Sequence, residues 1–154
     1  MRTYHHTQFG KLWMVLLGLS LVLGLVGVGT LVDGVEEEAG VLLLIVAAIL
    51  FVAAQCFVAL TVSDRGDHLS VHFGPVPLFR KRIPYADMLS VEPSRSSLFE
   101  GWGIHLVPGS GWTWNIWGRT CVDVHMAQGN RTRIGTDDQA ALLAFLRARL
   151  GQAD

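Results

Sequence analysis

Cysteines are scarce in this chain and two long stretches carry no charge, and both absences narrow its function. Cys56 and Cys121 are the only cysteines, one in an apolar stretch and one on a predicted strand. They predict packing rather than a disulfide, a redox pair or a metal site. Residues 12–32 and 41–62 contain no Asp, Glu, Lys, Arg or His. Because ionisable groups inside a membrane usually mark ion or proton pathways, their absence argues against a channel or transporter.

Catalytic motifs are also lacking. Ser110 lies in Pro108-Gly109-Ser110-Gly111, which does not have the Gly-x-Ser-x-Gly spacing of a nucleophile elbow and indicates a hairpin turn. No glycine-rich phosphate loop precedes a helix. His68 and His72 share one face of a predicted strand, whereas a zinc site needs three or four convergent ligands. We therefore expect a protein that is not an enzyme and has no cofactor or metal.

The two apolar stretches organise the chain. Hydrophobic residues make up 51% of it and charged residues only 16%, with the apolar excess in the first 62 residues. A helix of about 20 residues, rising ~1.5 Å per residue, covers the ~30 Å hydrocarbon core of a bilayer. The sequence thus predicts two membrane-spanning helices, at about 12–32 and 41–60, joined by a short loop over 33–40. The first stretch is longer than a signal-peptide core and no small-x-small cleavage site follows it, which favours an uncleaved span.

The charges flanking the stretches predict the orientation. The loop carries Asp33 and three glutamates but no Lys or Arg. Arg2 and Lys11 precede the first stretch, and Arg65 and a basic run at 80–82 follow the second. Because Lys and Arg are enriched on the cytoplasmic side, we expect a multi-pass protein of the inner (plasma) membrane with both termini in the cytoplasm.

Small residues indicate how the two helices meet. Ser20 and Gly24 form a small-xxx-small pair that lets another helix approach closely. The second stretch offers alanines as counterparts, among them Ala47 and Ala54. We expect this contact within the hairpin, and contact between copies of the chain is the alternative.

From Ser63 onward the pattern alternates, as in half-buried strands. Short alternating segments separated by turn signals predict about seven antiparallel strands in a sandwich or open barrel, within a domain over 63–154. The strand pattern starts near residue 60, so the end of the second stretch can become the first strand. Residues 1–10 are interpreted as a short polar surface tail. A C-terminal helix at about 137–150 is predicted from Thr136 as N-cap, Gln139 completing a capping box, and Gly151 ending it.

Several motifs in this domain resemble a known family. They are Gly101-Trp102-Gly103-Ile104, then Gly118, Val122, Val124 and Gly129, and finally Arg133-Ile134-Gly135-Thr136-Asp137. The chain resembles small bacterial membrane proteins in which a pleckstrin-homology (PH) type domain follows a two-helix hairpin. The resemblance implies an all-β PH-like barrel of seven strands capped by a C-terminal helix, without known enzymatic activity.

The basic run Arg80-Lys81-Arg82 is the best binding candidate, and Arg131 and Arg133 are expected on the same surface. Anionic headgroups attract each such residue by roughly 1 kcal/mol near a membrane. The alternative is an ordinary polar strand face that follows the positive-inside bias. The segment 63–68 carries two acids and one Arg, unlike the basic first hairpin of phosphoinositide-binding PH domains.

The tryptophans are candidates of another kind. Trp102 and Trp117 are possible anchors at a protein interface or in lipid headgroups, whereas Trp112 and Trp114 share a strand face and are expected in the core. The sequence as a whole predicts a non-enzymatic integral membrane protein that presents a cytoplasmic PH-like binding or assembly module. The alternative is a structural subunit of a larger membrane complex without lipid recognition. Expected partners are the bilayer, anionic headgroups, and a protein partner or second copy, but not nucleic acid.

Overall fold

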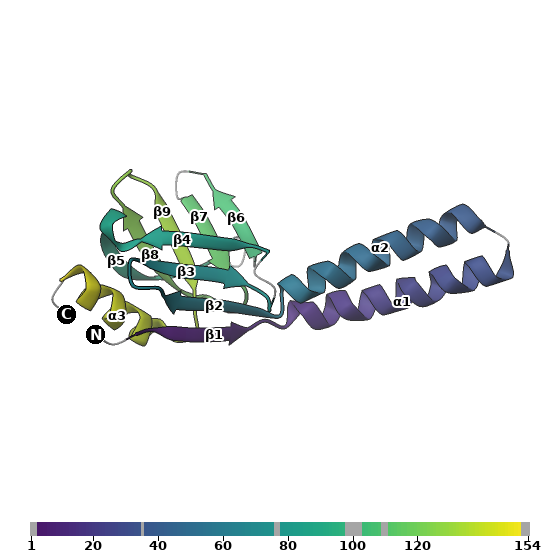
Figure 1. The fold of residues 1–154 in the computed structure, drawn as a ribbon, viewed down its shortest axis with the longest axis horizontal. Helices are drawn as coiled ribbons and strands as arrows, with labels where there is room; N and C mark the ends of the chain where they lie inside the picture. Colours follow the sequence, from purple (N-terminus) through teal and green to yellow (C-terminus); the bar gives the residue numbers. More distant parts are fainter. Residues whose placement is uncertain (1–2, 35, 76–77, 98–102, 109–110, 152–154) are drawn as a thin grey trace.

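The protein consists of a helical hairpin that projects from one end of a β-rich domain (Figure 1). A computed structural model describes residues 3–34, 36–75, 78–97, 103–108 and 111–151. A C-terminal helix lies at the opposite end of the domain from the hairpin (Figure 1). In chain order the elements are β1 His5–Phe9, α1 Leu12–Asp33, α2 Glu37–Cys56, β2 Ala59–Asp64, β3 His68–Phe73, β4 Arg80–Pro84, a 3-10 turn Tyr85–Asp87, β5 Met88–Arg95, β6 Gly103–Val107, β7 Gly111–Asn115, β8 Thr120–Met126, β9 Arg131–Gly135 and α3 Gln139–Leu150.

The hairpin is held together by small residues, as predicted. Ser20 is buried and its hydroxyl donates a hydrogen bond to the carbonyl oxygen of Ala47 at 2.8 Å. Gly27 and Gly40 bring the two backbones close, because a Cβ on Gly27 would lie 3.0 Å from the Gly40 carbonyl oxygen. The contact within the hairpin is therefore confirmed. Both helices are long and apolar enough to cross a membrane, by length and composition.

The second helix is shifted relative to the predicted span. It begins at Glu37 and ends at Cys56, and the chain is already in β2 at Ala59. The prediction of 41–60 is thus too late at both ends. Glu37 and Glu38 lie in the first turn of α2, where carboxylates are favourable beside the positive end of the helix dipole. They extend the helix beyond its apolar run.

The first sheet corrects both the predicted tail and the domain boundary. Its order is β1-β2-β3-β4, so the strand before the hairpin pairs with the strand after it. In this register His6 lies opposite Val62 and Gln8 opposite Leu60. The residues of β1 on the core side are polar, so the apolar alternation that reveals a strand is missing. Gln8 is nevertheless 5% exposed, and its amide donates to the carbonyl oxygen of Trp117 at 2.6 Å.

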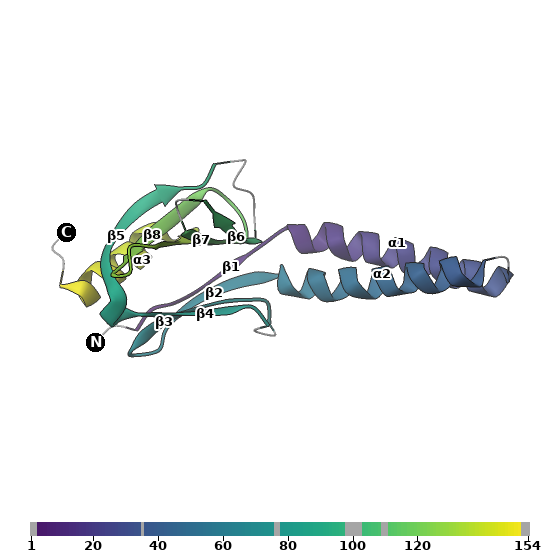
Figure 2. The ribbon, with the colours of Figure 1, turned by 90° about the horizontal axis from the view of Figure 1, so that it is seen from above.

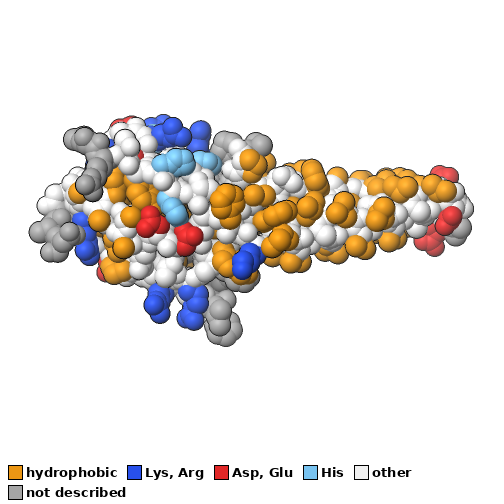
Figure 3. Space-filling model, turned by 90° about the horizontal axis from the view of Figure 1, so that it is seen from below, with side chains coloured by type: hydrophobic (Ala, Val, Ile, Leu, Met, Phe, Trp, Pro, Cys, Tyr) orange, Lys and Arg blue, Asp and Glu red, His pale blue; other side chains and the backbone are white. Residues whose placement is uncertain are grey.

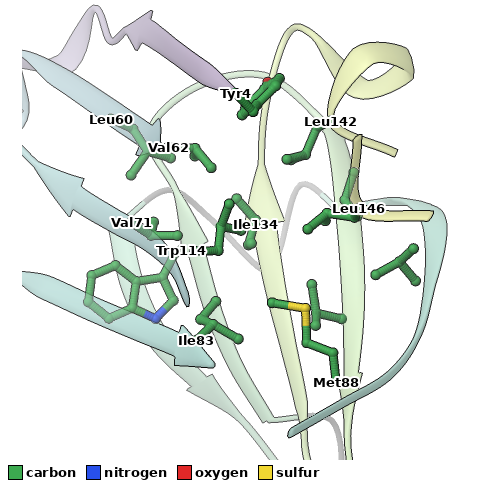
Figure 4. Close-up of a cluster of buried hydrophobic side chains, with 14 of the residues drawn as sticks. Tyr4, Leu60, Val62, Val71, Ile83, Met88, Trp114, Ile134, Leu142 and Leu146 are labelled. Atoms are coloured by element: carbon green, nitrogen blue, oxygen red, sulfur yellow. The ribbon is translucent and has the colours of Figure 1, made fainter. Parts of the chain in front are cut away.

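The second sheet has the order β5-β8-β9-β7-β6 and packs against the first (Figure 2). The described residues thus form nine strands rather than about seven. Strands β7 and β9 are parallel, so the domain is not wholly antiparallel as predicted. The two sheets and α3 enclose one core (Figure 4). Its largest fully buried apolar side chains are Phe73, Leu60, Leu69, Ile83, Ile116, Ile134, Leu142, Leu146, Val71, Val122 and Val124.

Two details of the core differ from the sequence prediction. Trp114 is buried, but Trp112 is 44% exposed, so its assignment to the core was wrong. Thr113 and Trp114 follow Trp112 on β7 and are both buried, although successive side chains of a strand point to opposite faces. Asn115 is completely buried, and its amide donates to the Gly118 carbonyl oxygen at 3.2 Å.

The C-terminal helix is confirmed, with a different start. It begins at Gln139, with Asp138 as N-cap, and the left-handed Gly151 ends it as predicted. The capping box is wrong. The Thr136 hydroxyl accepts from the backbone N–H of Asp138 at 3.0 Å, and the Gln139 amide donates to the carbonyl oxygens of Ser94 and Cys121. Gln139 therefore joins the helix to the second sheet instead of closing its own N-terminus.

Candidate functional site: a cationic sheet face

The outer side of the first sheet carries a row of basic and polar side chains. Residues paired across neighbouring strands project to the same side of a sheet. Two rows of such pairs cross it, running His5–Ser63–Ser70–Arg82 and Thr7–Thr61–His72–Arg80. The alternate positions hold the core residues of β2 and β3, so these rows face outward. We call the following set the cationic face: His5, Arg65, Ser70, His72, Arg80 and Arg82.

Two adjoining depressions hollow this face, with volumes of about 430 and 490 Å³. Arg65, His72 and Pro75 line both of them. His5 belongs to the first depression, and Arg80 and Arg82 belong to the second. No acidic side chain is among the described residues that line them. In Figure 3, blue Lys and Arg side chains lie at the upper edge of the domain, with pale-blue histidines just below them, one of which borders red acidic side chains.

Positive charge is left uncompensated at the centre of this face. Burial, followed by the positive charges of Arg65, Arg80 and His5, lowers the pKa of the His72 imidazole. Among the residues that the structure describes, neither Arg65 nor Arg80 forms an ion pair with a carboxylate. Clustered like charges repel one another, so a bound anion would stabilise this arrangement.

Among the described residues, the countercharge of this face lies at its rim. Asp67 accepts from the ring nitrogen Nδ1 of His68 at 2.5 Å and lies 3.4 Å from a guanidinium nitrogen of Arg82. The hydrogen bond from His68 lowers the pKa of the exposed Asp67 carboxyl. Arg82 is therefore partly neutralised, and Arg65, His72 and Arg80 are the groups best placed to hold an anion.

The structure separates the predicted basic run by strand face. Arg80 and Arg82 point outward, because alternate residues of a strand share one face of the sheet. Lys81 pairs with the buried Val71 on the opposite side, and its Nζ lies 6.0 Å from the centre of the Trp112 ring. Partial burial lowers the pKa of this ammonium group. Lys81 is thus no part of the cationic face.

Arg131 and Arg133 were wrongly expected on the same surface. They lie on β9 in the second sheet, where both bind the buried carboxylate of Asp123. Arg131 Nη1 lies 2.7 Å from this carboxylate and Arg133 Nε lies 2.8 Å from it. Both arginines therefore neutralise a buried charge. The sequence prediction was wrong because long-range pairing decides which sheet a strand joins.

The two candidate tryptophans have different outcomes. Trp102 lies outside the described residues. Trp117 is partly buried and packs against the core, with the ammonium of Lys11 5.7 Å from its ring centre. Trp117 therefore helps to join the second sheet to the start of α1. Its indole is not presented as an isolated surface anchor.

Sequence reasoning missed four members of the cationic face, namely His5, Arg65, Ser70 and His72. The alternation of β3 does place Ser70 and His72 on a polar strand face, which is the only signal among them. No protein-family model matches the chain, and no curated protein matches it either. Within the described ranges, no three His, Cys, Asp or Glu side chains are grouped so as to hold a metal ion.

Proposed function

We propose that this chain is a two-span inner-membrane protein whose cytoplasmic domain is a non-enzymatic module that binds phosphate-bearing lipid headgroups. The observation that carries the proposal is the pair of uncompensated arginines, Arg65 and Arg80, that lie around His72 on the cationic face. The membrane part is supported by two apolar helices with large exposed side chains, such as Leu25 at 74% exposure. Such side chains are favourable in contact with lipid and unfavourable in water.

The ends of the hairpin support the proposed orientation. The tip, away from the domain, carries Asp33 and Glu36 to Glu38 and no basic residue. The base carries Lys11 and, two positions later, Trp13, residue types that are typical of the membrane–water interface. The domain lies on the Lys- and Arg-containing side, which is the cytoplasmic side by the positive-inside rule.

Tethering makes a weak lipid site effective. Near an anionic membrane, each basic residue contributes roughly 1 kcal/mol of attraction, which alone gives only weak binding. A short tether raises the local concentration of the binding partner to the millimolar range or above. The chain joins β1 to α1 through only Gly10 and Lys11, so the cationic face stays close to the headgroups.

We also propose a relation to PH-like domains. Two packed sheets followed by a C-terminal helix support it, together with the glycine-containing motifs around Gly103, Gly118 and Gly135. The domain of this chain additionally takes its first strand from the segment before the hairpin. A structural subunit without lipid recognition is the competing function, and the following experiment separates the two.

The test measures the pKa of His72 by NMR in the full chain, reconstituted into nanodiscs of phosphatidylcholine with or without phosphatidylglycerol. A bound phosphate favours the imidazolium, so we expect the pKa of His72 to rise with the anionic lipid. His125 on β8 is the matched control, because it is a strand histidine already paired with Glu92 at 2.9 Å. Its shift reports the general surface potential.

Two variants and one soluble ligand complete the design. Arg65→Gln with Arg80→Gln should abolish the extra shift of His72 relative to His125. Equal shifts of both histidines in the wild type would refute lipid binding at this face. Inorganic phosphate is titrated into neutral nanodiscs in a separate arm. A shift of His72 there, without one from phosphatidylglycerol, would overturn the lipid assignment in favour of a soluble anion.

A further inference from the structure

Exposed apolar side chains gather at the end of the β-rich domain that adjoins the hairpin. Phe9 at the end of β1 is 68% exposed, and Leu78 and Phe79 before β4 are 62% and 51% exposed. Isolated exposed apolar residues are ordinary on protein surfaces. These three, however, lie beside the base of two helices whose own surface is apolar, so their location calls for an explanation.

The backbone holds the connection between β3 and β4 against the last turn of α2. Gly74 has a left-handed φ of 72°, and a Cβ at this position would lie 2.7 Å from the carbonyl oxygen of Gln55. The Gly74 N–H donates to the Ala59 carbonyl oxygen at 2.7 Å. Figures 1 and 2 both show the end of β3 and the start of β4 on the side of the domain that faces the base of α2.

The three apolar side chains flank this point. Phe79 is fixed beside β3, because its carbonyl oxygen accepts from the Phe73 N–H at 3.0 Å. Phe9 lies opposite Ala59, the residue that also binds Gly74. Side chains of Phe9, Val58 and Pro75 line one depression there. In Figure 3, orange apolar atoms continue from the hairpin onto this end of the domain.

Basic residues lie close in sequence to two of these side chains. Arg80 follows Phe79 at the start of β4, and Lys11, two positions after Phe9, lies directly before α1. Apolar and aromatic side chains next to Lys or Arg are typical of segments that lie in the membrane interface, where the apolar group enters the acyl boundary and the charge meets phosphates. Lipid surrounding the base of a membrane-inserted hairpin would adjoin this surface directly, which favours lipid over a protein partner as its occupant.

We infer that Phe9, Leu78 and Phe79 form a second membrane contact, which inserts into the interface of the bilayer around the base of α1 and α2. This inference rests on the proposed membrane insertion of the hairpin. The contact fixes the orientation of the domain. Because the strands of the first sheet extend away from the hairpin (Figures 1 and 2), the Arg80 row of the cationic face is then closer to the headgroups than the Arg82 row.

Spin labels on the full chain in phosphatidylcholine vesicles test the contact. Each label is attached to a single cysteine at position 78, 89 or 25, in a background in which Cys56 and Cys121 are replaced by alanine. Leu89 is the matched control, since it is also a leucine with 62% exposure but lies on β5, whose start is far from the hairpin (Figures 1 and 2). Collisions with oxygen report lipid, and collisions with a water-soluble nickel chelate report water.

We expect the oxygen-to-nickel collision ratio at position 78 to be several-fold higher than at position 89 and lower than at position 25. Equal ratios at 78 and 89, with a high ratio at 25, would overturn the inference and leave the membrane hairpin intact. A label at 78 shielded from both reagents would overturn it in favour of a protein contact. A ratio at 25 as low as at 89 would instead refute the proposed membrane insertion. Near-UV circular dichroism of each labelled variant checks the fold.

Discussion

Replacing Asp123 with asparagine removes a buried negative charge on which three side chains converge. Its carboxylate accepts hydrogen bonds from Ser94 Oγ at 2.7 Å, Arg133 Nε at 2.8 Å and Arg131 Nη1 at 2.7 Å. The Asp123 side chain is 2% exposed and that of Arg133 only 8%. The variant keeps the size of the side chain but removes the countercharge that Asp123 provides for the buried Arg133 guanidinium.

The expected cost is about 3 kcal/mol in the free energy of unfolding. Removing one partner of a buried ion pair typically costs 3–5 kcal/mol, and we take the lower end because an asparagine carbonyl still accepts one hydrogen bond. Arg131, with a 19% exposed side chain, is closer to water and adds less. Since domains are commonly stable by only 5–15 kcal/mol, such a loss is large.

Guanidinium titration of the full chain in detergent micelles, followed by tryptophan fluorescence, measures this cost. Trp114 is buried in the core and reports its opening. The control is Asp137→Asn, the same chemical change at a carboxylate whose side chain is 61% exposed and pairs with His6. We expect that control to lie within about 1 kcal/mol of the wild type. An Asp123 variant as stable as the control would refute the assignment of a buried ion pair.

The Asp123 carboxylate also predicts how the free energy of unfolding falls at acid pH, here called the acid limb. Burial alone would raise the pKa of Asp123, but hydrogen bonds from Arg133 and Ser94 and the charges of both arginines outweigh it and lower the pKa. The unfolded chain, with an ordinary carboxyl pKa near ~3.9, then binds more protons than the folded chain. This stabilisation is complete above that pH and is lost as the pH falls through the lower folded pKa. Asp123→Asn should flatten that limb, and an unchanged acid limb in the variant would contradict it.

Three further predictions test other parts of the structure. Gly111→Ala should lower the free energy of unfolding far more than Gly129→Ala in the same titration. Both glycines have a positive φ, but only a Cβ at Gly111 would lie against the backbone of a neighbouring strand. Equal effects would argue against the β7–β9 pairing. Thr136→Ala should lower the unfolding free energy by about 1 kcal/mol through loss of its bond to the Asp138 N–H, and an unchanged midpoint would disprove that contribution. A cysteine at Gly34 should react with an impermeant thiol reagent in intact cells, whereas labelling only after permeabilisation would reverse the proposed topology.

The candidate site was only partly predictable from the sequence. The alternation of β4 places Arg80 and Arg82 on one face and Lys81 on the other, because successive side chains of a strand point to opposite sides. No local pattern shows that His5 lies in the same sheet, since β1 pairs with β2 across the entire hairpin. The uncompensated charge around His72 therefore became visible only in the folded domain.

By itself, the sequence determined the two apolar helices, the alternating strands and the final helix that ends at Gly151, because the signals for these elements lie within the elements. Tertiary structure alone decided which strands became neighbours. It placed β1 beside β2 and Arg131 and Arg133 around Asp123, and it directed Gln139 toward the carbonyl oxygens of Ser94 and Cys121 instead of a capping box. The physical reason is that the partners of these groups are far away in sequence, so the register of the sheets selects them.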